Sequence, residues 1–238
     1  MKNIKNMKID IFADGADIKS IKKLDKNSLI KGFTTNPTLM RQSGIRNYLE
    51  FAKNIARVIK KKPISLEVFS DKIQEMEQQA LILSKISKNF NVKIPITNSK
   101  GISTSKLIAR LSSNGVVCNV TAIFTFNQIK KIMKLLPKDT KIILSIFAGR
   151  IADSGKDPEE LLKKIKKYLK NYKNVKLLWA STREVFNIFQ AARSGCDIIT
   201  VPYGILSKFK YIGKNQTTFS LETVKMFKDD AKKAGYKI

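Results

Sequence analysis

The stretch Asn91-Val-Lys-Ile-Pro-Ile-Thr97 is a short apolar β-type run, and a helix-like segment at residues 103–112 follows it. This pairing of a strand with an amphipathic segment recurs along the chain and is typical of βα units around a parallel sheet. Eight strand-like runs can be counted, at residues 8–13, 31–35, 64–69, 91–96, 116–121, 141–147, 175–181 and 197–201. Eight units filling 238 residues predict an α/β fold, a TIM (β/α)8 barrel.

The segments between the runs complete this prediction. Apolar residues recur at helical spacing in residues 47–61, 72–88, 103–112, 125–136, 158–172 and 182–192. A doubly wound open sheet is the alternative, but it would place a glycine-rich phosphate turn after an early strand, and the sequence has none. We expect one barrel domain over residues 1–238, with a surface loop at 208–218 and a closing helix around 220–234.

The net charge of +27 raises the question of nucleic-acid binding, because basic residues neutralise phosphates. Only seven of the 46 basic residues are arginines, and the lysines are spread over nearly every helix-like segment. A nucleic-acid groove would concentrate arginine and stacking aromatics on one element. The composition therefore indicates a lysine-rich surface and no specific nucleic-acid partner.

Composition also limits the chemistry and the location. The chain has no histidine, which excludes histidine triads, histidine acid/base catalysis and histidine metal sites. Cys118 and Cys196 stand in apolar runs without a CxxC motif, which predicts buried reduced thiols. The lysine-rich start, residues 1–8, precedes a strand pattern, and no apolar run reaches the roughly 18 residues of a membrane span. We expect a cytoplasmic protein with no membrane partner.

Lys93 lies inside the apolar run at 91–97, from which a charged side chain is normally expelled. Burial disfavours the ammonium form of a lysine, and a neutral amine attacks ketones and aldehydes to form a Schiff base. Lys93 is therefore the candidate nucleophile. The alternative is that it ends an edge strand and extends its charge to solvent.

Polar side chains also stand at the ends of most predicted strands. In a TIM barrel the carboxyl ends of the strands build the active site. The candidate residues there are Asp14, Thr34, Thr35, Asn36, Glu67, Lys93, Asn119, Thr121, Ser145, Arg150, Ser181 and Arg183. Asn119 and Thr121 are two residues apart and point the same way. In a chain that otherwise prefers lysine, the two arginines suggest bidentate recognition of a phosphate or carboxylate.

The two carboxylates have alternative explanations. Asp14 precedes a helix and would serve as its cap, although Asp17 fits that position better. Glu67 either faces solvent at a sheet edge or is buried beside a base, and pointing inward it would share protons with Lys93.

Asn36 and the two arginines, Arg150 and Arg183, also have explanations that involve no substrate. Asn36 would form a turn before a helix starting near Pro37, an explanation that is stronger for the neighbouring threonines. Arg150 would form a surface ion pair with Asp153, and the charge of Arg183 would lie beside Glu184 on a helix surface.

Five motifs together resemble the transaldolase family. They are Gly32-Phe-Thr-Thr-Asn-Pro-Thr-Leu-Met40, Val92-Lys-Ile-Pro-Ile-Thr97, Cys118-Asn-Val-Thr-Ala-Ile-Phe-Thr-Phe126, Ser145-Ile-Phe-Ala-Gly-Arg-Ile-Ala-Asp153 and Ala180-Ser-Thr-Arg183. The second resembles the segment around that family's Schiff-base lysine. The match runs in order from about Ile9 to Pro202, and five motifs in register are specific where one would be weak.

The resemblance implies a class I mechanism on sugar phosphates, with no metal or organic cofactor. Lys93 would attack the ketone of a ketose phosphate, and Glu67 with Thr121 would move protons through a water. Asp14 would be the general base on the C4 hydroxyl. The implied reaction converts sedoheptulose 7-phosphate and glyceraldehyde 3-phosphate to erythrose 4-phosphate and fructose 6-phosphate, in the pentose phosphate pathway.

The resemblance also implies the substrate-binding residues. Asn36 and Asn119 would hold the hydroxyls of the dihydroxyacetone fragment, and Ser145 lies in the same set of active-site strands. Arg150, Ser181 and Arg183 would bind the substrate phosphate. Gly15 departs from the pattern, because family members usually have threonine or a similar residue after the aspartate, and Gly101 comes one residue later than usual.

Two other functions remain alternatives. Relatives in the compact branch of this family cleave fructose 6-phosphate; they tend to carry glutamine where this chain has Glu67 and tyrosine where it has Phe147. Glu67, Asn119 and Phe147 favour transfer over cleavage. From a different class, the chain would be a non-catalytic polyanion-binding barrel. The compact branch often builds pentamer-based rings, so we expect a homo-oligomer.

Overall fold

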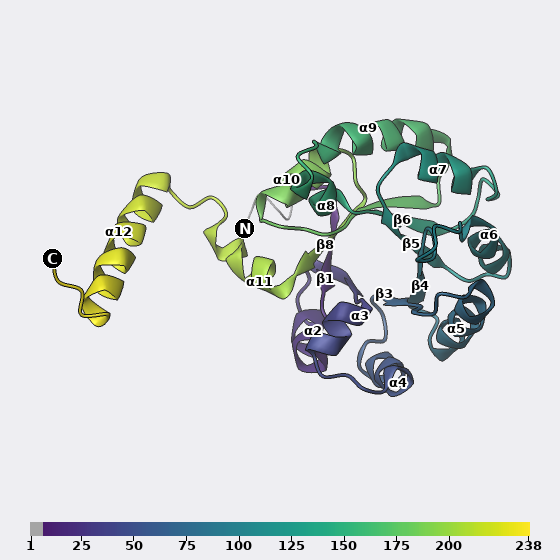
Figure 1. The fold of residues 1–238 in the computed structure, drawn as a ribbon, viewed down its shortest axis with the longest axis horizontal. Helices are drawn as coiled ribbons and strands as arrows, with labels where there is room; N and C mark the ends of the chain where they lie inside the picture. Colours follow the sequence, from purple (N-terminus) through teal and green to yellow (C-terminus); the bar gives the residue numbers. More distant parts are fainter. Residues whose placement is uncertain (1–6) are drawn as a thin grey trace.

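The structure, a computed structural model, describes residues 7–238. In this range eight parallel strands in chain order close into a barrel, because β1 pairs with both β2 and β8 (Figure 1). The strands are β1 (Asp10–Asp14), β2 (Ile30–Thr34), β3 (Ile64–Glu67), β4 (Phe90–Pro95), β5 (Cys118–Ile123), β6 (Ile142–Ile146), β7 (Val175–Trp179) and β8 (Ile198–Pro202). The predicted TIM barrel is confirmed, and the open sheet is wrong since closure leaves these strands without an edge.

Helices surround the barrel (Figure 1). They are α2 (Ile18–Asp25), α3 (Pro37–Gln42), α4 (Tyr48–Val58), α5 (Ile73–Ile86), α6 (Ser105–Ser113), α7 (Phe126–Met133), α8 (Ala148–Asp153), α9 (Pro158–Tyr168), α10 (Phe186–Arg193) and α11 (Tyr203–Leu206), with 3-10 turns η1 (Leu169–Asn171) and η2 (Ser207–Tyr211). Each longer helix buries one stripe against the sheet, as α4 does with Phe51, Ala52 and Ile55. Asp17 caps α2 by accepting a hydrogen bond from the Ser20 N–H at 2.8 Å, as predicted.

The barrel has a packed interior beneath its carboxyl end. Phe12, Ile143, Leu178, Ala180 and Ile198 form a separate buried cluster there. Gly32 makes room for it, because a Cβ at this position would lie 2.6 Å from the Phe12 ring. These packed side chains fill the barrel interior, so a cavity at the carboxyl end does not continue through the barrel.

Among the helices predicted between the strands, the two largest differences from the predicted bounds are in α10 and α9. The helix predicted at 182–192 begins at Phe186, because the side-chain oxygen of Asn187 accepts hydrogen bonds from the N–H groups of Arg183 and Glu184 and holds a turn there. The helix predicted at 158–172 ends at Tyr168 and continues as the tighter turn η1. Cys118 and Cys196 are buried free thiols, as predicted.

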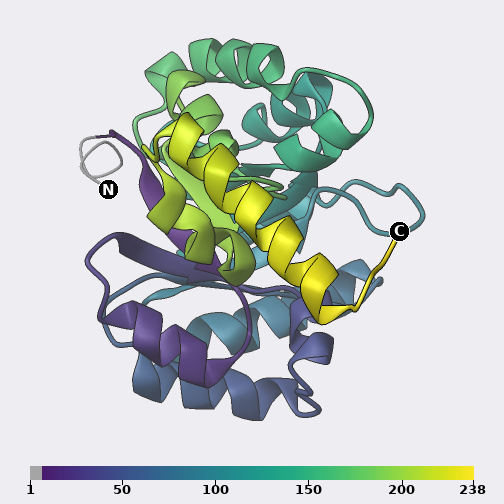
Figure 2. The same cartoon turned by 90° about the vertical axis from the view of Figure 1, so that its left-hand side faces the viewer.

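The C-terminal segment does not close the barrel. α12 (Gln216–Lys233) has no buried residue and extends away from the ring of helices (Figure 1), and viewed from that side it lies in front of the barrel (Figure 2). The expected helix around 220–234 therefore exists, but it covers neither end of its own barrel. The loop expected at 208–218 is mostly η2 and the first turn of α12. Of the expected domain, residues 1–6 lie outside the described range, as does most of the lysine-rich start.

Within residues 7–238, none of the helices combines the length and the apolar character that crossing a membrane requires.

Candidate active site

The carboxyl ends of the strands surround a cavity of about 480 Å³. Eleven of the thirteen residues predicted for the site line it, from seven different strands or the loops that follow them: Asp14, Thr34, Asn36, Glu67, Lys93, Thr121, Ser145, Phe147, Arg150, Ser181 and Arg183. The parallel register brings them together, because Glu67 is level with Lys93 and Lys93 with Asn119 on successive strands.

Lys93 is the most deeply buried cation of the site, with 7% of its surface exposed. Its Nζ lies 2.9 Å from the Glu67 Oε2 and donates to the Thr35 carbonyl at 2.9 Å. β4 lies between β3 and β5 in a closed barrel, so the alternative of a lysine at a sheet edge reaching solvent is wrong. A buried amine beside one carboxylate can exchange a proton with it, which is what a nucleophilic lysine requires.

Asp14 ends β1 and accepts a hydrogen bond from the Thr34 hydroxyl at 2.7 Å. Since the single hydroxyl proton of Thr34 goes to Asp14, the Thr200 hydroxyl in contact with it must be the donor. Burial raises the pKa of Asp14, while the Lys93 charge and the Thr34 hydrogen bond oppose that shift. A carboxylate with a raised pKa is suited to act as a base, because it both loses and regains its proton readily.

Gly15, the departure from the family pattern, has a steric cause. A Cβ there would lie 2.4 Å from the Tyr203 ring, so the tyrosine occupies the space that a side chain would need. The Tyr203 hydroxyl is buried without a hydrogen-bond partner among the described residues. Its pKa is raised, chiefly by burial and then by the charges of Asp17 and Asp14.

Like Thr35, Asn119 is a predicted site residue that does not line the cavity. It is fully buried, donates from Nδ2 to the Ser65 hydroxyl at 3.0 Å, and accepts from the Ser145 hydroxyl at 2.6 Å. Ser145 does line the cavity. Asn119 thus orients Ser145 through this hydrogen bond. Its own amide does not reach the cavity in which a substrate would bind.

Asn36 and Thr121 reach the cavity in different ways. The Asn36 side-chain oxygen caps α3 by accepting from the Leu39 N–H at 3.0 Å, as the turn explanation predicted, and the residue lines the cavity as well. The Thr121 hydroxyl is buried, lines the cavity, and has no hydrogen-bond partner among the described residues. Such a group is available to a water or a substrate oxygen.

The two arginines lie at one side of the cavity. The Arg150 guanidinium lies over the Phe147 ring, 5.5 Å from its centroid. Arg183 forms a two-point ion pair with Asp153, at 2.6 Å from Nη2 and 3.0 Å from Nε, and this lowers the pKa of Asp153. Asp153 therefore pairs with Arg183, and the explanations that paired Arg150 with Asp153 and set Arg183 beside Glu184 as surface charge are wrong.

A close backbone contact fixes this side of the cavity. Ser181 has a positive φ of 64°, and a Cβ on Gly149 would lie 1.6 Å from the Ser181 carbonyl oxygen. Only glycine allows the start of α8, which carries Arg150, to approach the segment that carries Ser181 and Arg183 so closely.

Sequence reasoning underrated Thr34 and missed Thr200, Ser65 and Tyr203. Thr34 is one of the strand-end candidates, for which the turn explanation is the stronger one, but its hydroxyl donates a hydrogen bond to Asp14. Thr200 stands in an apolar strand, and a polar residue of inward parity there was a usable signal. Nothing in the local sequence of Tyr203 indicates that its ring packs against Gly15.

Comparisons with known proteins show which family this chain is similar to. A family model described as "Transaldolase/Fructose-6-phosphate aldolase" matches residues 11–238. The chain is 35% identical over 228 residues to a "Probable transaldolase" of Thermoanaerobacter sp. (strain X514), covering 95% of this chain and 99% of that protein. It is 37% identical over 196 residues to a "Probable transaldolase" of Bartonella tribocorum (strain CIP 105476 / IBS 506), covering 82% and 86%.

A solved structure shares the fold. "Crystal structure of a putative phosphonomutase from Burkholderia cenocepacia J2315" superposes with a TM-score of 0.59, covering 89% of this chain and 93% of that one. At 10% identity this similarity shows the barrel alone.

Proposed function

We propose that this chain, which belongs to the transaldolase/fructose-6-phosphate aldolase family, is a transaldolase that moves a dihydroxyacetone unit between sugar phosphates through a lysine Schiff base. The observation that carries the proposal is the buried Lys93 amine, 2.9 Å from the Glu67 carboxylate at the bottom of a polar cavity. We also propose that the chain acts in the cytoplasm and, as the resemblance suggests, in the pentose phosphate pathway.

The first step forms the Schiff base. The Lys93 amine attacks the C2 carbonyl of a ketose phosphate, and the resulting carbinolamine loses its hydroxyl as water to give a protonated imine. Glu67 accepts the proton that the ammonium must lose and returns one to the departing hydroxyl. The buried, unpartnered Thr121 hydroxyl supports the role of binding the water that relays this proton.

The second step breaks the C3–C4 bond. Asp14 removes the proton of the C4 hydroxyl, C4 becomes the aldehyde of the leaving aldose phosphate, and the bonding electrons flow into the imine to form an enamine. The raised pKa of Asp14 supports this role. An acceptor aldehyde then enters, the enamine carbon attacks it, the protonated Asp14 returns its proton, and hydrolysis of the imine frees Lys93.

The remaining residues hold the substrate. Arg150, Ser181 and Arg183 line the same side of the cavity and would bind the phosphate, with Arg183 kept in place by Asp153. Asn36 and Ser145 would hydrogen-bond the hydroxyls of the three-carbon fragment. We assign Asn119 the role of fixing Ser145, since its own amide groups are engaged below the cavity.

Transfer and cleavage differ in their need for an acceptor. The assay supplies fructose 6-phosphate with and without erythrose 4-phosphate and follows release of glyceraldehyde 3-phosphate. We expect continuous release only with the acceptor and a single turnover without it, because Glu67 and Phe147 stand where the cleaving relatives tend to carry glutamine and tyrosine. Continuous release without acceptor, together with free dihydroxyacetone, would make the chain an aldolase.

Thr34→Val tests the role of Asp14. Removing the hydroxyl that stabilises the Asp14 carboxylate raises the pKa of Asp14 further, so the acidic limb of the kcat/KM profile is expected to move to higher pH. The measurement is the pH–rate profile of both proteins. Thr35→Val is the matched control, because the Thr35 hydroxyl is buried without a partner among the described residues and its carbonyl contact to Lys93 is retained. An unchanged limb in Thr34→Val would remove Asp14 as the base.

We also propose that the chain works as a homo-oligomer, with α12 against a second copy. Leu221, Val224 and Phe227 recur every three residues along α12, and they are 55%, 61% and 62% exposed. An apolar stripe on a helix that buries no residue against the described part of its own chain supports an intermolecular contact. Leu221→Ser/Val224→Ser/Phe227→Ser is expected to lower the mass seen by light scattering toward a monomer. A wild-type protein that is already monomeric would contradict the proposal.

A further inference from the structure

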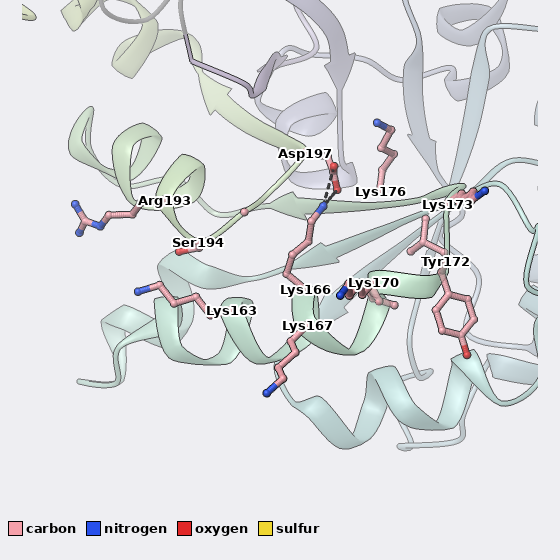
Figure 3. Close-up of a pocket in the computed structure, with 13 residues that line it drawn as sticks. Lys163, Lys166, Lys167, Lys170, Tyr172, Lys173, Lys176, Arg193, Ser194 and Asp197 are labelled. Atoms are coloured by element: carbon pink, nitrogen blue, oxygen red, sulfur yellow. Dashed lines mark hydrogen bonds and ion pairs between the residues drawn. The ribbon is translucent and has the colours of Figure 1, made fainter.

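A second cavity lies at the opposite end of the barrel from the candidate active site. It is an open groove of about 550 Å³ beside the C-terminal half of α9, η1, the first residues of β7 and the end of α10 (Figure 3). Val175 and Asp197, at the amino ends of β7 and β8, lie in its lining, whereas the active-site cavity is built at the carboxyl ends. The proposed transaldolase reaction uses none of the residues of this groove.

The groove is lined by lysines that are not all neutralised. Residues 161–183 contain seven lysines and one arginine but no aspartate or glutamate. Lys166 pairs with Asp197 at 2.9 Å, and Arg193 pairs with Glu159 at 2.5 Å. Within residues 7–238, no carboxylate lies within ion-pair distance of Lys167, Lys170, Lys173 or Lys176, and residues 1–6 carry no acidic side chain. Among the described residues, no carboxylate is paired with any of these four side chains.

The positive surface continues beyond the groove. A neighbouring cavity of about 460 Å³ at the same end of the barrel shares Lys176 and Asp197 with it and adds the two cations Lys8 and Lys31 and one carboxylate, Asp10. The helix dipole accounts for basic residues in the last turn of α9, such as Lys167. It does not account for Lys173 and Lys176, which lie outside any helix.

We propose that this groove binds a polyphosphate anion, meaning a chain of linked phosphate groups that is either inorganic or the triphosphate of a nucleotide. Several unpaired cations around one concave surface match a ligand with several adjacent charges. Lysine is a point charge on a flexible stem, and it suits repeating phosphates better than one phosphate of fixed orientation, which the arginine fork recognises.

Nucleic acid fits the groove less well. Single strands need exposed aromatic rings on which bases stack, and the one aromatic residue here, Tyr172, packs against Tyr168 with ring centroids 6.2 Å apart. The one arginine of the groove is engaged by Glu159. The sugar monophosphates of the proposed reaction carry a single phosphate and have the arginine pair at the other end of the barrel.

The test uses the full chain and measures binding of inorganic tripolyphosphate by titration calorimetry near physiological salt. The variant Lys170→Gln/Lys173→Gln/Lys176→Gln is compared with Lys19→Gln/Lys53→Gln/Lys106→Gln, which removes the same charge from exposed positions on α2, α4 and α6. We expect the groove variant to bind about tenfold more weakly or worse and the control to bind as the wild type does. Thermal unfolding of both variants verifies that they fold.

Three further arms complete the test. Binding of ATP with an affinity equal to that of tripolyphosphate means that the triphosphate itself is recognised, and weaker binding of ATP points to the inorganic source. Fructose 6-phosphate in excess should leave tripolyphosphate bound, because the two cavities lie at opposite ends of the barrel. Equal losses in the groove and control variants, or tighter binding of a single-stranded RNA than of tripolyphosphate, would overturn the proposal.

Discussion

Replacing Lys93 with alanine is expected to lower kcat for glyceraldehyde 3-phosphate release by at least about 10⁴-fold, because the imine that accepts the electrons of the C3–C4 bond no longer forms. Borohydride reduction in the presence of fructose 6-phosphate should attach one three-carbon unit to the wild-type chain and none to Lys93→Ala. Mass spectrometry of the intact protein and of its peptides measures both.

Lys100→Ala is the matched control for this experiment. Lys100 follows the same strand at the same end of the barrel but is exposed to solvent and does not line the active-site cavity. It should keep normal activity and normal trapping. A trapped adduct on a peptide without Lys93, or full activity of Lys93→Ala, would contradict the Schiff-base assignment. If the Schiff-base assignment failed, the expected binding of polyphosphate at the groove would be unaffected, so the two proposals can be tested independently.

Gly149→Ala is expected to cost about 3 kcal/mol or more in free energy of unfolding and to raise the KM for sugar phosphates. The added Cβ would lie 1.6 Å from the Ser181 carbonyl oxygen and 2.7 Å from its carbon, so the backbone of one segment has to move. Because Arg150 directly follows Gly149 and Arg183 stands two residues after Ser181, the displacement separates the proposed phosphate ligands. Denaturant unfolding and steady-state kinetics measure the two effects.

Gly204→Ala provides the comparison. Gly204 lies in α11, and a Cβ there meets nothing within 4 Å. Since alanine restricts the unfolded chain and favours a helix, this variant should be as stable as the wild type or more stable by about 0.5–1 kcal/mol. Equal stability of the Gly149 and Gly204 variants would mean that α8 shifts freely, and the close approach would then not be what positions the arginines.

The barrel and most of the site could be predicted from the sequence because they depend on local patterns. Strand-like runs alternating with amphipathic segments specify βα units, and a parallel barrel then collects the residues that follow the strands at one end. A polar residue in an apolar run, such as Lys93 or Glu67, is therefore visible in the sequence as a candidate. The same parity rule would have found Thr200.

What the sequence did not show depends on contacts between distant segments. The pairing of Arg183 with Asp153, the Tyr203 ring against Gly15 and the approach of Gly149 to Ser181 join residues that no local pattern connects. The lysines at 163–176 look in the sequence like one more solvated basic stretch, and only the fold gathers them around a groove and leaves four without carboxylates.

The sequence by itself determined the fold class and the set of groups available for chemistry, because hydrophobic periodicity and residue type are local properties. Only the tertiary structure decided which of those groups meet. In the structure Lys93 pairs with Glu67, and the Thr34 hydroxyl donates to Asp14. Asn119 bonds to Ser145 without lining the cavity, and α12 extends away from its own barrel. The physical reason is that hydrogen bonds and ion pairs act over a few ångströms, and distances of that size are set by strand register and packing, which the chain reaches only when it closes.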